Sequence, residues 1–320
     1  MVEGRALAVG VIGSQAGIDR LKGRAEGKVR LEAVRTPYGS VDVLRGLVGG
    51  APFAGVAKAI AAPAPPHRMP HRATYWALKK SGCARVLTTS VVTSLDERLR
   101  LGDLFVPHDF LDFTGWSPTY FEGGPEGVHN AEMDAPFCRG LSRELVSLAR
   151  SFGLRVLEEG TVATVPGPQH PSAAECARLA QAGARAVSFS AAAEAKLARE
   201  LGICLVAAGV TVRGAVDDKA WRPGPEAGEG KEPSQAELLR AFAEGREPPP
   251  RAEAASAGPR GRRHMQGEKG GARPREAEAL KAKLKDVDLR LEEAAAAFVP
   301  QAAAMAPCRN CPKGEGPHGL

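Results

Sequence analysis

The sequence has few aromatic residues, no long apolar run and no recognisable leader. Aromatic residues make up only 5% of the 320 residues. No stretch reaches the roughly 18 uninterrupted apolar residues that a membrane-spanning helix requires. The opening residues, MVEGRALAVGVIGSQAG, lack the basic head and the apolar core of a secretory signal. We therefore expect a cytoplasmic protein without a membrane segment.

Cysteine is sparse as well, and its spacing argues against a structural zinc site. Cys308 and Cys311 form a C-R-N-C pair near the end of the chain, but a second pair that such a site needs is missing. The other four cysteines lie in apolar contexts that are typical of small core residues. We predict no metal site, and for the C-R-N-C pair either a disulfide or no bond.

The charge balance leaves nucleic-acid binding open but does not favour it. The net charge is +6 and the pI is about 9.1, as in some proteins that bind nucleic acids. Several of the basic residues lie in one Gly- and Pro-rich segment, and the scarcity of aromatic residues leaves no stacking platform for bases. Binding through residues 246–275 is a separate hypothesis that a gel shift with and without this segment tests.

Short apolar runs alternate with amphipathic stretches over residues 7–212. Apolar runs predict strands within 7–13, 41–56, 84–92, 103–114, 160–168, 184–190 and 203–212. Helical spacing and stop signals predict helices at 72–82, 141–153, 171–183 and 191–202. Strands that are apolar along their whole length are typical of a sheet covered on both faces. The predicted fold is therefore α/β, with a central mixed β-sheet flanked by helices.

The composition changes after residue 245. Residues 246–274 are rich in Pro, Gly, Ala and charge, and they lack the apolar area to form a core, which predicts a flexible insertion. Residues 275–299 predict a helix, and 300–320 a tail. An apolar stripe on the helix is formed by Leu280, Leu284, Val287 and Leu291. The stripe either packs on the domain at 1–245 or forms a self-associating coiled coil.

Six segments resemble one known family in their order and spacing. They are VRTPYGSVDVLRGLVGG (34–50), HRMPHRATYWALKKSGC (67–83), TTSVVTSLDERLRLGDLFVPHDFLDFT (88–114), DAPFC (134–138), GPQHPSAAE (167–175) and GARAVSFSAAAEAKLARELGIC (183–204). Together they resemble the trimeric, phosphate-dependent purine nucleoside phosphorylases and methylthioadenosine phosphorylases. The resemblance covers residues 7–245, extends to the final helix and the tail, and implies the nucleoside phosphorylase fold.

The resemblance also implies an activity. Such a protein would cleave a purine nucleoside, S-methyl-5′-thioadenosine or a related one, into the free base and a ribose 1-phosphate derivative, in purine and methionine salvage. Inorganic phosphate would be the co-substrate, and no cofactor is implied. The expected assembly is a homotrimer. The reaction needs a site that holds a dianion beside the sugar and stabilises the leaving base.

Matching positions supply the expected site residues. Those expected to bind phosphate are Ser14, Thr89, Ser90 and Ser190. Those expected to bind the nucleoside are Phe189, His67, Thr211 and His170. Hydroxyl groups are suitable ligands for phosphate because they donate hydrogen bonds to its oxygens.

Two expected ligands are replaced. The family's R-H-G-x-x-H segment reads APAPPH here, so we expect the cation for phosphate to be lost unless Arg68 or Arg72 reaches the site. His71 is expected to be structural. The family's base-binding Asp or Asn is Val212, which offers no hydrogen bond to a purine. Two hypotheses therefore stay open: an active phosphorylase, and a catalytically impaired relative that acts as a binding or structural module.

Overall fold

The computed structural model describes residues 7–58, 65–123, 127–214 and 274–305. Apart from the first residues of the last helix, they belong to one compact unit. The predicted insertion at 246–274 lies outside the described residues except for Pro274, and so do Cys308 and Cys311. None of the described helices is long and apolar enough to cross a membrane.

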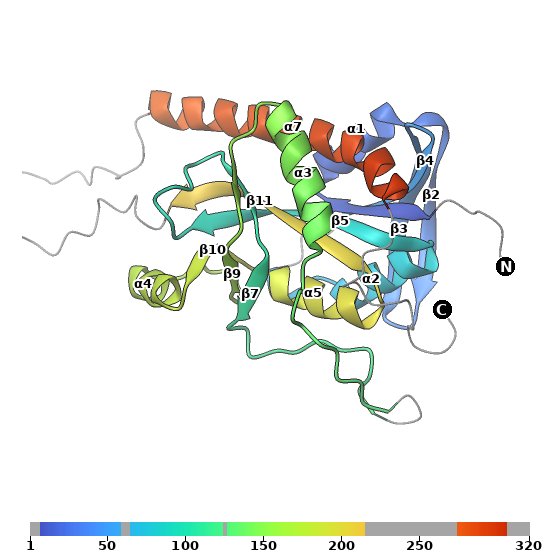
Figure 1. Ribbon diagram of the computed structural model, residues 1–320, viewed down its shortest axis with the longest axis horizontal. Helices are drawn as coiled ribbons and strands as arrows, with labels where there is room; N and C mark the ends of the chain where they lie inside the picture. The colour runs from blue at the N-terminus through green and yellow to red at the C-terminus, as the bar shows by residue number, and fades with distance from the viewer. Residues whose placement is uncertain (1–6, 59–64, 124–126, 215–273, 306–320) are drawn as a thin grey trace, which may run out of the picture. The chain divides into compact units, whose positions relative to one another are not determined.

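The described strands form one mixed sheet (Figure 1). They are β1 (Ala8–Gly13), β2 (Glu26–Thr36), β3 (Gly39–Val48), β4 (Ala51–Ala57), β5 (Cys83–Ser94), β6 (Leu104–Val106), β7 (Asp109–Asp112), β8 (Val156–Glu158), β9 (Thr161–Thr164), β10 (Ala184–Ser188) and β11 (Cys204–Gly214). The main path runs β2-β3-β4-β1-β5-β10-β9-β7, and β11 adds β6 and β8 beside β5. The predicted mixed α/β sheet is thus confirmed.

Three parallel pairings place the ends of the central strands side by side. β1 pairs in parallel with β4 and with β5, with Gly13 opposite Ala57 and Ile12 opposite Thr88. β11 pairs in parallel with β5 along its length. The last residues of β1 therefore lie between the end of β4 and the middle of β5, where Thr89 follows Thr88. Ligands of open α/β sheets bind at such strand ends.

Helices cover both faces of the sheet (Figure 1). They are α1 (Gln15–Arg24), the 3₁₀ helix η1 (Pro66–Arg68), α2 (His71–Lys80), α3 (Arg139–Ser151), α4 (Ala173–Gln181), α5 (Ala191–Glu200) and α7 (Pro274–Ala304). Apolar residues of α1, α3 and α7 pack with Val9, Val11 and Leu87 on one face. Those of α2 and α5 pack with Ile12 and Val86 on the other. Successive side chains of a strand point to opposite faces of the sheet, which explains why neighbours such as Val11 and Ile12 belong to different core clusters.

Local sequence signals explain most of these elements. Gly49 and Gly50 both have positive φ and form the turn between β3 and β4. At α4, Ser172 accepts from the Glu175 backbone N–H while the Glu175 carboxylate accepts from the Ser172 N–H, which is the predicted capping box. Strand β2 lacked a prediction because, in this outer hairpin strand, Val34 is the one residue that is buried.

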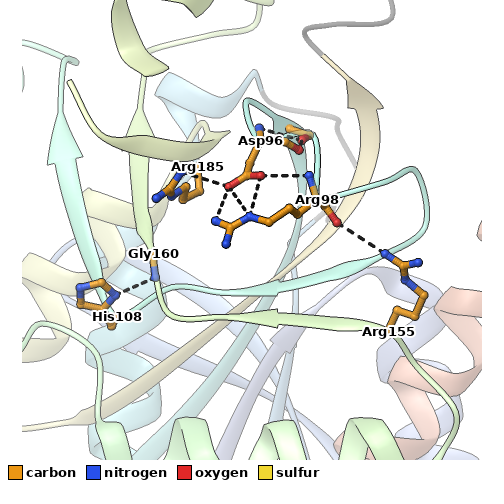
Figure 2. A network of polar contacts seen from close by, with 7 residues as sticks. Asp96, Arg98, His108, Arg155, Gly160 and Arg185 are labelled. Atoms are coloured by element: carbon orange, nitrogen blue, oxygen red, sulfur yellow. Dashed lines mark hydrogen bonds and ion pairs between the residues drawn. The ribbon is translucent and has the colours of Figure 1, made fainter. Parts of the chain in front are cut away.

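Residues 103–114 predict either a strand pair or a strand with a loop; the structure has two strands there, β6 and β7, which do not pair with each other. β6 lies between β11 and β8, and β7 pairs with β9. The loop before β6 is held by a charged network (Figure 2). Asp96 accepts two hydrogen bonds from the Arg98 Nε and Nη2 atoms and forms an ion pair with Arg185. These contacts with Arg98 lower the pKa of Asp96 to about 2. Arg155 donates to the backbone oxygen of Arg98.

Helix α7 packs on the chain's own sheet. Val287, Leu291 and Phe298 are buried in the core cluster that contains α1 and α3. The helix extends beyond the predicted end at residue 299, to Ala304. Buried Arg85 of β5 donates to the Ala302 oxygen at 2.5 Å, and this contact satisfies one of the carbonyl groups that every helix leaves unpaired at its end.

Candidate functional site

A cavity of about 400 Å³ opens where β1 and β4 end. Its walls come from the β1–α1 turn, the end of β4, the start of α2, the middle of β5, the β10–α5 turn and one side of α7. The polar and aromatic residues that line the cavity include Ser14, Lys58, Thr89, Ser90, Phe189 and Ser190. The structure thus brings all four predicted phosphate ligands and Phe189 into one cavity.

The remaining predicted residues are placed differently. His170 is exposed and does not line the cavity, but its ring contacts that of Phe189, with 5.4 Å between the ring centroids. His67 and Thr211 do not line the cavity. His67 is exposed on η1, whereas His71 at the start of α2 lines the cavity instead. Neighbouring residues of a strand point to opposite faces, and because Val210 faces the cavity, Thr211 points away from it.

The cavity contains a cation that the sequence comparison missed. Lys58 directly follows β4, and its backbone N–H donates to the Gly13 oxygen at 2.8 Å. Lys58 is among the residues that line the cavity, and its Nζ atom is buried. A basic residue is therefore present at the cavity, although it comes from outside the APAPPH segment. The available signal was its position as the first residue after an apolar strand, since such strand ends form sites.

Neither alternative arginine reaches the cavity. Arg72 forms an ion pair with Glu122 at 2.5 Å, and its guanidinium lies 4.5 Å from the Tyr38 ring centroid. Arg68 is exposed on η1 and, like Arg72, is not among the described residues that line the cavity. Among the described residues that line the cavity, Lys58 is therefore the only lysine or arginine.

Lys58, His71 and Glu194 form a buried cluster of charged and titratable side chains, with Glu194 between the other two. The Lys58 Nζ atom lies 2.9 Å from the Glu194 Oε1 atom, and the His71 Nδ1 atom lies 4.0 Å from the same oxygen. Burial acts to raise the pKa of Glu194, but attraction to Lys58 and His71 outweighs burial and lowers it. Burial lowers the pKa of His71. The cluster therefore pairs the Glu194 carboxylate with Lys58, and burial disfavours the charged form of the neighbouring His71 ring.

The first amide groups of α5 are already satisfied inside the protein. The Ser188 hydroxyl accepts from the backbone N–H groups of Ser190 and Ala191, and the Thr164 hydroxyl accepts from that of Ala192. The side chain of Ser190 makes no capping hydrogen bond. An anion in this cavity would consequently meet side-chain hydroxyls and Lys58 rather than a free helix end.

The other hydroxyls gather around Gly13. A Cβ atom on this glycine would lie 2.9 Å from the Thr89 Oγ1 atom, so the close approach requires glycine. Ser14 caps α1, because its Oγ atom accepts from the Gly17 backbone N–H at 3.0 Å. Its hydroxyl hydrogen stays available as a donor. Lys58, Thr89 and Ser14 therefore adjoin the turn at Gly13. We call this part of the cavity its anion end.

Helix α7 contributes an acidic wall, formed by Asp288 and Glu292. Glu292 forms an ion pair with Arg20, and its Oε1 atom lies 3.6 Å from the point where a Cβ on Gly17 would sit. Burial raises the pKa of both carboxyl groups, and nearby Arg20 opposes this effect. The cavity thus combines hydroxyls and a lysine with a wall of opposite charge. Among the described residues, no group of His, Cys, Asp and Glu side chains is arranged to hold a metal ion.

Comparison with known proteins places this geometry in a family. Residues 11–243 match the sequence profile of the Phosphorylase superfamily. The 6-oxopurine nucleoside phosphorylase of Pyrococcus furiosus is 35% identical over 187 residues, which cover 56% of this chain and 70% of that protein. The S-methyl-5′-thioadenosine phosphorylase of Anopheles gambiae is 37% identical over 167 residues, 51% of this chain and 58% of that protein.

Solved structures agree on the fold. A methylthioadenosine phosphorylase from an Antarctic soil metagenomic library superposes with a TM-score of 0.69 at 20% identity, over 95% of this chain and 89% of that one. The methylthioadenosine phosphorylase of Schistosoma mansoni, solved with adenine, gives 0.67 at 20% identity, over 94% and 92%. With its cavity at the ends of β1 and β4, the chain belongs to the Phosphorylase superfamily, as a relative of the purine nucleoside and methylthioadenosine phosphorylases.

Proposed function

We propose that this protein cleaves a purine nucleoside with inorganic phosphate. The substrate would be S-methyl-5′-thioadenosine or a related purine nucleoside, and the products a free purine and a ribose 1-phosphate derivative. One observation carries the proposal: hydroxyl-bearing residues from two turns and from the middle of β5, namely Ser14, Ser190 and Thr89, line one cavity together with Lys58. The names of the relatives support the same reaction class.

At the anion end, phosphate would be held by charge and by hydrogen bonds. Lys58 supplies a positive charge, and the hydroxyls of Ser90 and Ser190 supply donors that fit its oxygens. Thr89 lies beside them and would turn its hydroxyl to phosphate from the Ile12 oxygen, to which it donates at 3.4 Å. A phosphate oxygen would then form a bond to ribose C1′ while the bond from C1′ to the purine nitrogen breaks. The electron pair leaves with the purine, which takes up a proton. Holding the dianion beside the sugar lowers the barrier by orientation and electrostatics.

Phe189 is the candidate surface for the nucleoside. Its ring lines the cavity and lies against Gly167, where a Cβ atom would come within 2.9 Å of the Phe189 Cδ1 atom. The His170 ring contacts that of Phe189. An aromatic ring held by such contacts gives a purine or ribose a rigid apolar contact. Thr211, which points away from the cavity, has no part in this proposal.

A direct assay tests the proposal. Purified protein is incubated with methylthioadenosine, adenosine, inosine or guanosine, with and without phosphate, and the released base is measured by chromatography. We expect base release from at least one nucleoside only when phosphate is present. Release that does not depend on phosphate would indicate a hydrolase, and absence of release from all four would reject the proposed activity.

A relative that binds without turnover is the second candidate. Two observations favour it: the acidic wall of Asp288 and Glu292 disfavours a dianion, and Val212 packs against the core instead of offering a hydrogen bond to a base. Isothermal titration with phosphate and with methylthioadenosine separates the two candidates when it is combined with the base-release assay. Binding without base release supports the second.

Assembly and location are further parts of the proposal. Exposed apolar side chains at Phe113 (43%), Trp116 (46%) and Val128 (78%) support a contact with other copies of the chain. We propose a cytoplasmic homotrimer that acts in purine or methionine salvage. Light scattering coupled to size-exclusion chromatography measures the assembly, and a monomer would reject this part.

A further inference from the structure

Glu194 is a fully buried carboxylate that faces the cavity's cation. It lies in the first turn of α5, one turn after Ser190, and is 2% exposed. A buried charge is costly to the folded state unless it is paired. Glu194 is paired with Lys58, whose Nζ atom lies 2.9 Å away. Apolar side chains at these positions would stabilise the fold at least as well as a buried ion pair does. The ion pair beside the cavity therefore serves the site rather than the stability of the fold.

Lysine needs such a partner to act as a fixed anion ligand. Its side chain is long and flexible, and holding one conformation costs entropy. An adjacent carboxylate opposes this cost, because it holds the ammonium in one place. The Lys58 Nζ atom is buried and, apart from the ion pair with Glu194, has no hydrogen-bond partner among the described residues. An ammonium group has three N–H donors, so donors of Lys58 remain unpaired beside the cavity.

His71 completes the support of this carboxylate. Its Nδ1 atom lies 4.0 Å from the Glu194 Oε1 atom, and its ring is buried at the start of α2. Lys58, His71 and Glu194 come from the end of β4, from α2 and from α5. The packing of three elements therefore fixes the position of Lys58 at the anion end.

We propose that Glu194 is a positioning residue that holds the Lys58 ammonium where phosphate binds. Glu194 acts through Lys58 and does not touch the substrate. The inference rests on the proposed function, because it assigns a role within the same site.

Substitution of Glu194 tests the proposal, with a matched control on the same helix. Glu194→Gln keeps the shape and removes the charge, and we expect the KM for phosphate to rise about tenfold, while the KM for the nucleoside changes little. Glu200→Gln is the control. Glu200 is also buried on α5 but accepts from the Thr119 hydroxyl and the Tyr120 N–H, away from the cavity. It should affect thermal stability and leave the KM for phosphate unchanged.

A second variant keeps the test informative if Glu194→Gln fails to fold. Glu194→Asp retains the charge but draws the carboxylate away from Lys58, so it should fold and still raise the KM for phosphate. A folded Glu194→Asp or Glu194→Gln protein with the wild-type KM for phosphate would overturn the proposal.

A double-mutant cycle shows whether Glu194 acts through Lys58. If it does, Glu194→Gln has no further effect on the KM for phosphate in a Lys58→Met protein. An equal effect in both backgrounds would overturn the positioning role.

Calorimetric titration with inorganic phosphate separates this inference from the proposed activity. If the wild type binds phosphate but releases no base, the activity fails, and the inference is then judged by whether Glu194→Gln weakens phosphate binding while Glu200→Gln does not. If the wild type binds no phosphate, both fail.

Discussion

Replacement of Lys58 by methionine gives the sharpest test of the anion end. Methionine has a similar length and no charge, so the change removes the cation but fills nearly the same space. A hydrogen bond to a charged group contributes about 1.5–3 kcal/mol. We therefore expect kcat/KM for phosphate to fall about 10- to 150-fold. The kinetic constants for the nucleoside at saturating phosphate should change much less, because Phe189 lies on another wall.

The same substitution should change how stability depends on pH. In the wild type, Lys58 and His71 hold the pKa of Glu194 below its ordinary value against the effect of burial. This contribution to stability is present above the ordinary carboxyl pKa and is lost as the pH falls through the lowered pKa. Without Lys58, burial dominates and raises the pKa of Glu194. The stability of the variant should then increase, relative to wild type, as the pH falls.

Breaking a buried ion pair costs about 3–5 kcal/mol when the remaining charge has no partner. For Lys58→Met this is an upper bound at neutral pH, because Glu194 can take up a proton and His71 lies 4.0 Å away. The double variant Lys58→Met/Glu194→Gln should recover part of the lost stability but none of the lost kcat/KM for phosphate. It thereby separates folding from binding.

Phosphate-dependent kinetics and thermal unfolding between about pH 5 and about pH 8 measure both effects, since the carboxyl and imidazole groups titrate in or near this range. A Lys58→Met protein with wild-type kcat/KM for phosphate would refute the anion-ligand role. A difference in melting temperature between variant and wild type that stays constant across this range would refute the pairing with Glu194.

Three further predictions follow from the same geometry. Burial lowers the pKa of His71, so wild-type stability should decline as the pH falls below about 6.5, the ordinary histidine value, and His71→Gln should flatten this decline in thermal unfolding. Glu292→Gln removes charge from the acidic wall and should lower the KM for phosphate about two- to fivefold, whereas Glu293→Gln, whose side chain does not line the cavity, should leave it unchanged. Gly167 has a φ of 62° and touches Phe189, so Gly167→Ala should destabilise the protein by about 1–3 kcal/mol and raise the KM for the nucleoside but not for phosphate.

Much of the fold was predictable because its signals are local. The capping box at Ser172 and Glu175 and the Gly49–Gly50 turn act over a few residues, and the structure contains both. Apolar runs identified the central strands, because strands covered on both faces need apolar residues throughout. β2 escaped prediction because an outer strand is largely exposed and reads as a polar segment. The partners of β6 and β7 also escaped, since pairing depends on distant strands.

The sequence by itself determined the α/β fold class, the family resemblance and the hydroxyl residues Ser14, Thr89 and Ser190, because each rests on a local motif. Only the tertiary structure showed that Lys58 lies at the cavity and that Glu194 pairs with it. It also decided that Thr211 points away, because the register of β11 sends Val210 toward the cavity. Such contacts join residues far apart in the chain, and they exist only when β4 and α5 pack around one sheet.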